Sequence, residues 1–231
     1  MLEKINTHIL YTTLCLSFVI VLFAFTPIDI YVQNFFYKFD THTWLIDKHN
    51  PILKYIFYNG IKKVLMIFSL LVLFTLIVFR KNKLVKMYRN GLIIILLSSY
   101  SVPFIVVSLK DVTNMPCPKN IEYYGGKYPD VNIFQSYPKD FKEKRIRCWP
   151  AGHASAGFAL MSIFFLFKKR KNQIIALSFA LFIAWNMALY KMLIGDHFLS
   201  HTLISMLLAW LIILIFAKIF QRKEIEKPTQ I

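Results

Sequence analysis

Long apolar stretches separated by short polar segments dominate this sequence. A helix needs about 20 mostly apolar residues to cross the hydrocarbon core of a bilayer. Six stretches approach or reach that length, and they cover residues 9–26, 64–79, 91–109, 154–167, 174–193 and 198–219. The fourth is short unless its helix begins in the preceding polar motif. The pattern predicts an all-α polytopic membrane protein with six transmembrane helices, forming a single domain over residues 1–231.

The connections between these stretches differ in charge, and this difference predicts the orientation of the helices. Residues 80–89 and 168–171 are rich in Lys and Arg and contain no acid. Short basic loops stay on the cytoplasmic side of a membrane. Six spans then place both termini in the cytoplasm, and the connections 27–63, 110–153 and 195–197 on the outer side. The basic C-terminal tail agrees with this topology through Lys218, Arg222, Lys223 and Lys227.

The composition excludes an ordinary soluble domain and a disordered chain. Hydrophobic residues make up 57% of the sequence, charged residues only 17%, and the mean hydropathy is +0.51. The net charge of +16 suits an anionic lipid or a phosphate. We infer no nucleic-acid partner, because the apolar stretches must first be buried in lipid. We also infer no obligate protein partner. The aromatic outer segment 27–63 predicts helices that lie in the membrane interface, with its aromatic side chains mainly in packing roles.

Two polar clusters at the outer ends of predicted spans do not fit a purely structural role. They cover residues 149–155 and 195–201. The predicted topology brings their ionisable residues to one face of the membrane together with the end of the third span, as a set made of Lys110, His153, Lys191, Asp196, His197 and His201. Ionisable groups at a bilayer are costly unless they are paired or used, so this set is the candidate active site.

The spacing within the second cluster indicates nucleophilic chemistry. His197 and His201 are four residues apart and share one helix face, which allows one imidazole to orient the other. A neutral histidine can attack phosphorus through one nitrogen when the proton on the other nitrogen is held by an acceptor. Lys110 and Lys191 supply positive charge for the phosphate oxygens. His153 can protonate the leaving oxygen, and this chemistry calls for no cofactor.

Taken together, these motifs resemble the type 2 phosphatidic acid phosphatase superfamily of membrane phosphatases. That family reads K-x6-R-P, then P-S-G-H, then S-R-x5-H-x3-D, and the resemblance covers residues 60–220. Here the first motif spans 110–118, the second 150–153 and the third 190–201. Five positions depart from the pattern, namely Cys117 for arginine, Ala151 for serine, Tyr190 for serine, Lys191 for arginine and His201 for aspartate.

The resemblance implies a role for each matching residue. His197 would be the nucleophile that forms a phosphohistidine, His153 the general acid, and His201 would take the orienting role of the aspartate. Lys110, Lys191 and the N–H groups around Gly152 would bind phosphate. Because lysine lacks the two-pronged guanidinium of arginine, we expect Arg147, in a loop that also carries Arg145, to reach the phosphate; a solvated basic loop is the alternative.

The motif wording looks most like bacterial lipid A phosphatases, which implies a cell inner membrane protein with a periplasmic active site. Lipid A phosphate is therefore the first candidate substrate. Undecaprenyl diphosphate, phosphatidylglycerol phosphate and phosphoryl transfer to another lipid remain alternatives. Membrane lipids are the expected partners.

The cysteines next to the first two motifs suggest a further link. Cys117 and Cys148 both lie in the outer loop, whereas Cys15 lies inside the first span. An oxidising envelope compartment would let the outer pair form a disulfide that closes a loop of about 30 residues, worth roughly 3 to 4 kcal/mol in the chain-entropy picture.

Two other readings of the histidines differ in kind. His153, His197 and His201 with Asp196 could bind zinc, since histidines at i and i+4 are a common ligand pair. The nearby lysines would repel a cation, so we predict no metal. Alternatively, the five departures could mark a non-catalytic protein that binds lipid. The presence of all three histidines argues against it.

Overall fold

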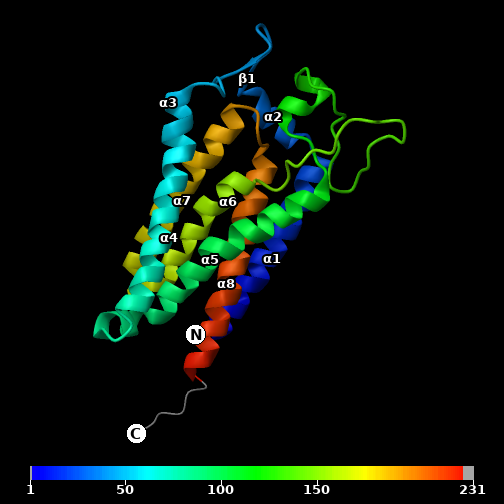
Figure 1. Cartoon of the computed structure of the whole chain (residues 1–231). Coiled ribbons are helices and arrows are strands. Elements are labelled where there is room, and N and C mark those ends of the chain that lie inside the picture. Colours follow the sequence, from blue (N-terminus) through cyan, green and yellow to red (C-terminus); the bar gives the residue numbers. More distant parts are fainter. Residues whose placement is uncertain (1, 226–231) are drawn as a thin grey trace.

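Long helices that run side by side form the body of the protein (Figure 1). The computed structural model describes residues 2–225, with side chains from 3 to 220. Lys227 and the side chains of Arg222 and Lys223 lie outside this part, so the predicted basic tail falls largely outside it. The long helices are α1 (Leu2–Phe25), α4 (Ile61–Val78), α5 (Lys83–Thr113), α7 (Arg170–Leu193) and α8 (Leu199–Ile225).

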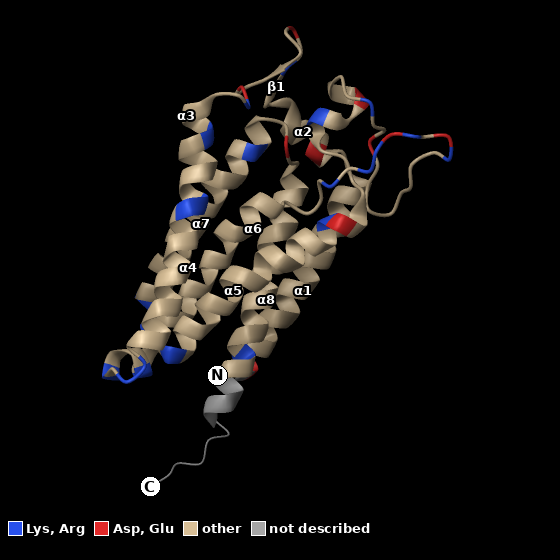
Figure 2. Ribbon diagram, in the orientation of Figure 1, with Lys and Arg blue, Asp and Glu red and all other residues tan. Residues whose placement is uncertain are grey.

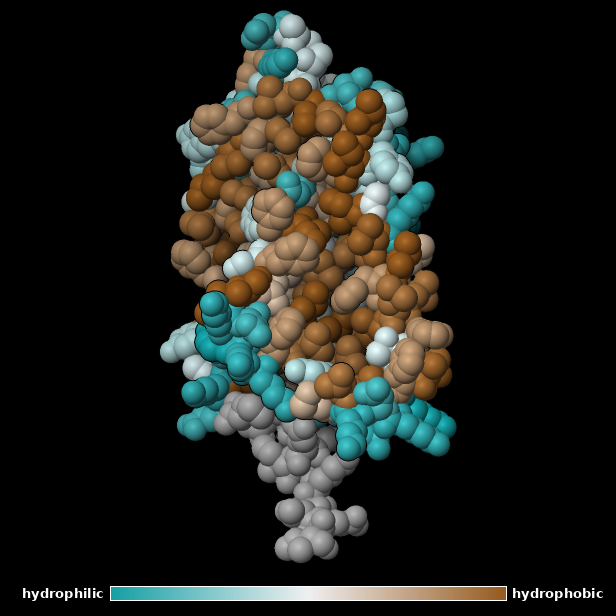
Figure 3. All heavy atoms as spheres, turned by 90° about the vertical axis from the view of Figure 1, so that its left-hand side faces the viewer, coloured by the Kyte–Doolittle hydropathy of each residue, from teal (hydrophilic) through white to brown (hydrophobic). Residues whose placement is uncertain are grey.

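Within residues 2–225, five segments are long and apolar enough to cross a membrane, which makes the chain a multi-pass membrane protein. They are Glu3–Phe25, Pro51–Val78, Lys83–Asn120, Arg170–Leu193 and Leu199–Phe220. Each of the five overlaps one predicted span almost completely. On the face drawn in Figure 3, apolar residues cover most of the middle of the bundle, and hydrophilic residues gather towards its two ends.

The fourth predicted span is a different kind of element. It begins with α6 (Gly152–Phe158), a short α-helix of 7 residues, and continues as η4 (Ala159–Leu166), a 3₁₀-helix of 8 residues. By length and composition this segment is only a shorter apolar helix. In the part of the chain that the structure describes, five helices therefore have spanning length, where the sequence predicted six.

The short segment is enclosed by longer helices. It packs against α5, α7 and α8, and Ala154, Phe158 and Ala159 are almost fully buried. The backbones approach closely at Gly157, where an added Cβ would lie 2.9 Å from the Cα of Ala184. Small residues at helix contacts let membrane helices pack without large side chains between them, so the segment fits the middle of the bundle.

The second span begins earlier than the sequence predicted. Helix α3 (Pro51–Lys54) is followed by a π-helix, η1 (Tyr55–Gly60), that runs into α4. Asn50 caps this start by accepting hydrogen bonds from the N–H groups of Ile52 and Leu53. Lysines 54, 62 and 63 interrupt the apolar pattern here and hid the start. Tyr55, Phe57 and Tyr58 therefore belong to this helix and not to a separate interfacial one.

The remainder of the first outer segment folds over one end of the bundle. It contains α2 (Ile28–Asn34) and a hairpin of β1 (Tyr37–Lys38) and β2 (Thr43–Trp44), in which Tyr37 pairs with Trp44. Two 3₁₀ turns, η2 (Pro118–Asn120) and η3 (Glu122–Tyr124), pack beside it. The rings of Tyr37, Trp44 and Tyr124 lie about 5 Å apart and form a small aromatic core. Helix α2 is thus a short helix within the segment for which interfacial helices were predicted, whereas the hairpin was not expected.

The two ends of the bundle differ in charge (Figure 2). The turn between α4 and α5 lies at the same end of the bundle as the N-terminus and carries mostly Lys and Arg. We call this end of the bundle the basic end. The opposite end carries both signs of charge, together with α2, α3 and the hairpin (Figures 1 and 2). We call this opposite end the site end.

Candidate active site

Four helix ends and one loop bring the predicted residues together at the site end. Lys110 lies in the last turn of α5, Gly152 and His153 begin α6, and Lys191 lies in the last turn of α7. The loop from α7 to α8 carries Asp196 and His197, and His201 lies in the first turn of α8. The common sidedness that the topology predicted is what the structure has.

Hydrogen bonds between the three motif segments hold this arrangement. The N–H of Ala151 donates to the carbonyl of His201 at 3.1 Å, and the N–H of Lys119 donates to the carbonyl of Gly195 at 3.0 Å. Gly195 has a φ of +72°, and an added Cβ would lie 2.3 Å from the Trp44 ring. Only glycine fits this bend, which sets the direction of the chain just before His197.

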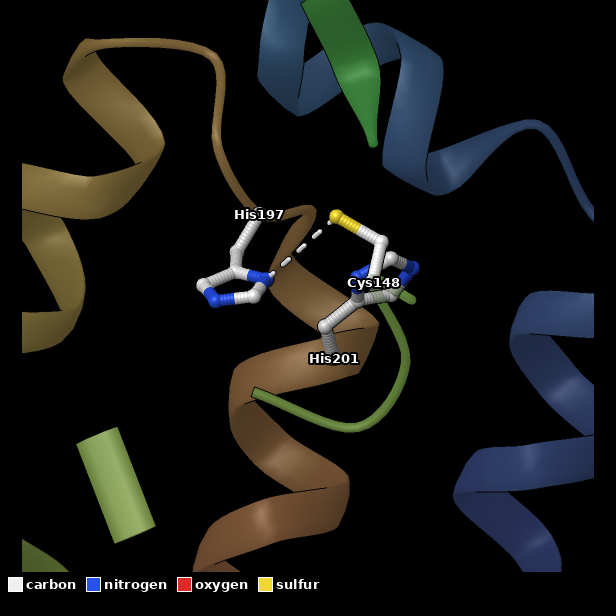
Figure 4. Close-up of side chains that lie close together, drawn as sticks. All are labelled: Cys148, His197 and His201. Carbon is white, nitrogen blue, oxygen red and sulfur yellow. Dashed lines mark hydrogen bonds between the residues drawn. The ribbon is translucent and has the colours of Figure 1, made fainter. Parts of the chain in front are cut away.

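His197 and His201 are both almost fully buried, with 2% and 1% of their surface exposed. Their ring centroids are 5.8 Å apart, and within the described residues no hydrogen bond joins them. Instead, the Sγ of Cys148 lies 4.0 Å from Nδ1 of His197 (Figure 4). The sequence predicted that His201 contacts and orients His197. In the structure the sulfur atom of Cys148 lies against Nδ1 of His197 instead. Nε2 of His197 has no hydrogen-bond partner in the described structure.

The environment of His197 keeps its ring neutral. Burial lowers its pKa well below the ordinary value, and the positive charge of Lys110 lowers the pKa further. A neutral ring with an unpartnered Nε2 has a free lone pair when the proton is on Nδ1. This state is the one that a nucleophilic histidine needs.

His153 faces the same space from α6. Its ring centroid is 6.1 Å from that of His197, and its Nδ1 lies 3.0 Å from the hydroxyl of Tyr58. Tyr58 lies in the π-helix η1. From the sequence, the aromatic side chains of the segment 27–63 were expected mainly to have packing roles. Single π-helical turns inside longer helices often occur at functional sites, but the sequence has no signal that places Tyr58 against His153.

The lysines and one acid form the charged part of the site. Nζ of Lys191 lies 2.9 Å from Oδ2 of Asp196, and Nζ of Lys119 lies 2.6 Å from Oδ1. Burial raises the pKa of Asp196, but the charges of Lys191 and Lys119 outweigh burial and hold that pKa below its ordinary value. Nζ of Lys191 also lies 4.5 Å from the centre of the Tyr58 ring. The sequence motifs do not identify Lys119 as a site residue, because the first motif spans 110–118 and ends one residue earlier.

Lys110 and Gly152 lie next to each other. A Cβ added to Gly152 would be 3.9 Å from Nζ of Lys110. The missing side chain therefore leaves space beside an ammonium group, where an anion can approach.

Cys117 and Cys148 are joined by a disulfide, the pairing that the sequence suggested. Their Cα atoms are 5.3 Å apart, within the normal range. The bond links the loop after α5 to the loop before α6, so it connects the first motif to the second. Cys15 is a free, exposed cysteine on α1.

Arg147 does not join the cluster. Its side chain is 65% exposed and forms an ion pair with Asp111 at 3.1 Å. Arg145 donates to the backbone carbonyl of Val112. Both arginines thus hold the loop against the end of α5. The structure favours the solvated basic loop over our expectation that Arg147 reaches the phosphate.

The donor atoms do not suit zinc. Cys148, His197 and His201 have possible ligand atoms within 4.8 Å of one another. However, the sulfur of Cys148 belongs to the disulfide and cannot act as a thiolate. His153 is not part of this group, and Asp196 is bound by two lysines. Only two histidines remain, fewer than the four ligands of a structural zinc site or the three of a catalytic one.

The fold and the site define a class of protein, a multi-pass membrane protein that gathers histidines and lysines at one end of its helix bundle. A family model described as the PAP2 superfamily matches residues 91–225. This match covers more than half of the chain, so the protein belongs to that family, and the resemblance to type 2 phosphatidic acid phosphatases is confirmed. Members of the family are phosphatases, which implies activity on lipid-type phosphates. No curated protein and no solved structure matches the chain.

Proposed function

We propose that the protein removes a phosphate from a lipid headgroup through a phosphohistidine on His197. One observation carries this proposal. A buried neutral histidine with an unpartnered Nε2 lies beside a second histidine, with Lys110 and Lys191 at the same end of a membrane bundle. This is the arrangement that nucleophilic attack on a phosphate monoester requires.

The residues divide the reaction between them. Nε2 of His197 attacks phosphorus and forms an N–P bond, while the bond from phosphorus to the lipid oxygen breaks. His153 donates a proton to that leaving oxygen, and Tyr58 holds the other ring nitrogen of His153. A water that gives its proton to His153 then attacks phosphorus, the N–P bond breaks with its electron pair returning to Nε2 of His197, and inorganic phosphate leaves. Lys110 and Lys191 stabilise the charge on the phosphate oxygens, next to the space at Gly152.

The family's aspartate has no carboxylate counterpart at His201, which changes the account of how His197 is oriented. Within the described residues, the atom facing Nδ1 of His197 is the disulfide sulfur of Cys148. A sulfur is a weak acceptor, so it supports the Nδ1–H tautomer less strongly than a carboxylate would. We expect a slower enzyme than one with the full motif, and a role for His201 in packing and polarity around His197.

We further propose six crossings, with the site end in the periplasm and both termini in the cytoplasm. A 3₁₀-helix rises about 2.0 Å per residue against 1.5 Å for an α-helix. The segment Gly152–Leu166 is therefore about 26 Å long, close to the roughly 30 Å of a bilayer core. The basic turn between α4 and α5 lies at the end that the positive-inside rule assigns to the cytoplasm. An inner membrane protein with this topology meets lipid headgroups of the outer leaflet.

Lipid A phosphate is the first candidate substrate, and undecaprenyl diphosphate and phosphatidylglycerol phosphate are the alternatives. Transfer of the phosphoryl group to a lipid hydroxyl is a further alternative, because a phosphohistidine can be attacked by either acceptor. A protein that only binds lipid would have the same fold without turnover.

The test is phosphate release by purified full-length protein in detergent micelles, with the three lipids as separate substrates. His197→Ala should abolish release, and His153→Ala should slow it by about a hundredfold or more. His8→Ala is the matched control, because His8 lies on α1 near the basic end. Rapid acid-free quenching should detect a phosphohistidine in the wild type. Release that persists in His197→Ala would refute the mechanism, and no release from any lipid would favour the binding protein.

A further inference from the structure

A pocket opens next to Lys191, one of the two lysines proposed to bind phosphate. Its volume is about 190 Å³, and its lining includes Lys48, His49, Lys54, Lys119, Lys191 and Asp196. We call it the lysine pocket. Three separate segments build it, namely the segment before and within α3, the turn η2 and the end of α7. Lysines from distant parts of the chain converge here, although like charges repel one another.

The pocket has more positive charge than its own acid can neutralise. Among the described residues that line the pocket, Asp196 is the sole acid, and it already binds Lys119 and Lys191. Lys48 and Lys54 form no ion pair within the described residues. The nearby carboxylate of Asp47 accepts the backbone N–H of His49. A concave site with this charge attracts an anion.

The contacts of Asp196 indicate which kind of anionic group Lys119 and Lys191 can bind. Its two carboxylate oxygens lie between the ammonium groups of Lys119 and Lys191, at 2.6 and 2.9 Å. Two charged donors around one bidentate anion is also a geometry that suits a phosphate. Lys191 therefore belongs both to the catalytic phosphate site and to the lysine pocket, which places the two sites within the reach of one side chain.

We propose that the lysine pocket binds a second phosphoryl group of the same substrate, so that the enzyme prefers a lipid diphosphate to the corresponding monophosphate. This proposal rests on the proposed function and narrows its substrate class. One phosphoryl group lies at His197, and the group attached to it reaches Lys119, Lys48 and Lys54. At about 30 Å³ per water, the pocket has room for one phosphate group with part of its hydration shell.

The test compares two substrates that differ only in the second phosphoryl group. Farnesyl diphosphate and farnesyl monophosphate are assayed with purified full-length protein in detergent micelles, and kcat/KM is measured for each. We expect the wild type to prefer the diphosphate. In Lys48→Gln/Lys54→Gln this preference should fall about tenfold, as expected for the loss of two partly solvated charge contacts. An unchanged ratio would overturn the proposal.

A matched control and a binding measurement separate this proposal from the proposed function. Lys139→Gln/Lys142→Gln removes two exposed lysines outside the pocket, and should leave the ratio unchanged. Calorimetry with inorganic pyrophosphate and inorganic phosphate uses His197→Ala and needs no turnover. Tighter binding of pyrophosphate that is lost on adding the Lys48→Gln and Lys54→Gln changes supports the pocket even if no lipid is hydrolysed. Equal binding of both anions would refute the pocket, whatever the activity.

Discussion

The hydrogen bond between Tyr58 and His153 offers a sharp test of how the proposed general acid is positioned. The two atoms, the Tyr58 hydroxyl oxygen and Nδ1 of His153, are 3.0 Å apart. The change Tyr58→Phe removes this bond and keeps the ring, whose centre lies 4.5 Å from Nζ of Lys191. Binding of phosphate by Lys191 should therefore change little, while the orientation of His153 is lost.

The size of the effect follows from the bond and its surroundings. A typical hydrogen bond contributes about 0.5 to 1.5 kcal/mol net, and more when a buried partner is left unsatisfied. Both side chains are part-buried, so we expect the middle of that range. At about 1.4 kcal/mol for each factor of ten, kcat should fall about threefold to tenfold, with KM nearly constant.

The assay uses two substrates that differ in their need for an acid. An alkyl phosphate needs a proton on its leaving oxygen, whereas p-nitrophenyl phosphate releases a stable anion. Tyr58→Phe should slow the alkyl phosphate more than the nitrophenyl ester. Tyr55→Phe is the control, because Tyr55 is exposed one turn earlier, with Lys63 5.6 Å from its ring centre. Equal losses for both substrates, or none, would refute the reasoning.

Three further predictions concern stability and pH. Cys117→Ala/Cys148→Ala opens a disulfide with a sequence separation of 31, so unfolding in detergent should become easier by about 4 kcal/mol in the chain-entropy picture; equal midpoints with and without the bond would contradict this. Burial holds the pKa of His197 well below its ordinary value, so protonation should stop the nucleophile only in clearly acidic solution, and an acid limb of kcat/KM at or above pH 6.5 would argue against His197. Burial raises the pKa of Asp29 to about 7, although hydrogen bonds from Ser200 partly offset this. The folded state then binds the proton more tightly than the unfolded state, so wild-type stability should fall as the pH rises from about 4 to 7, by at most about 1.4 kcal/mol per pH unit. Asp29→Asn should remove that fall in thermal unfolding scans, and parallel pH curves for the two proteins would count against the assignment.

The sequence pattern predicted the long helices well because membrane spans carry a strong one-dimensional signal. Each needs about 20 apolar residues in a row, and α1, α4, α5, α7 and α8 all have that signal. It failed where the signal is interrupted. Lysines near Tyr58 hid the first turns of the second span, and the 3₁₀ geometry of Ala159–Leu166 depends on packing against neighbouring helices.

The site was also predictable to a definite extent. His153, His197, Lys110 and Lys191 could be brought to one end of the bundle from topology alone, since each lies at the end of a predicted span or next to it. Their neighbours could not. The approach of Tyr58 to His153 and of Lys119 to Asp196 depends on contacts between residues 95 and 77 positions apart.

By itself, the sequence determined the membrane setting, the sidedness of the polar clusters and the family pattern, because these depend on hydropathy, loop charge and short motifs. Only the tertiary structure decided which atoms face one another. The disulfide sulfur of Cys148 faces His197, although His201 was expected to take the place of the family's aspartate there. Arg147 forms an ion pair with Asp111 and does not join the site. The physical reason is that these contacts depend on the path of the outer loops, and hydrogen bonds and glycine bends between distant segments set that path.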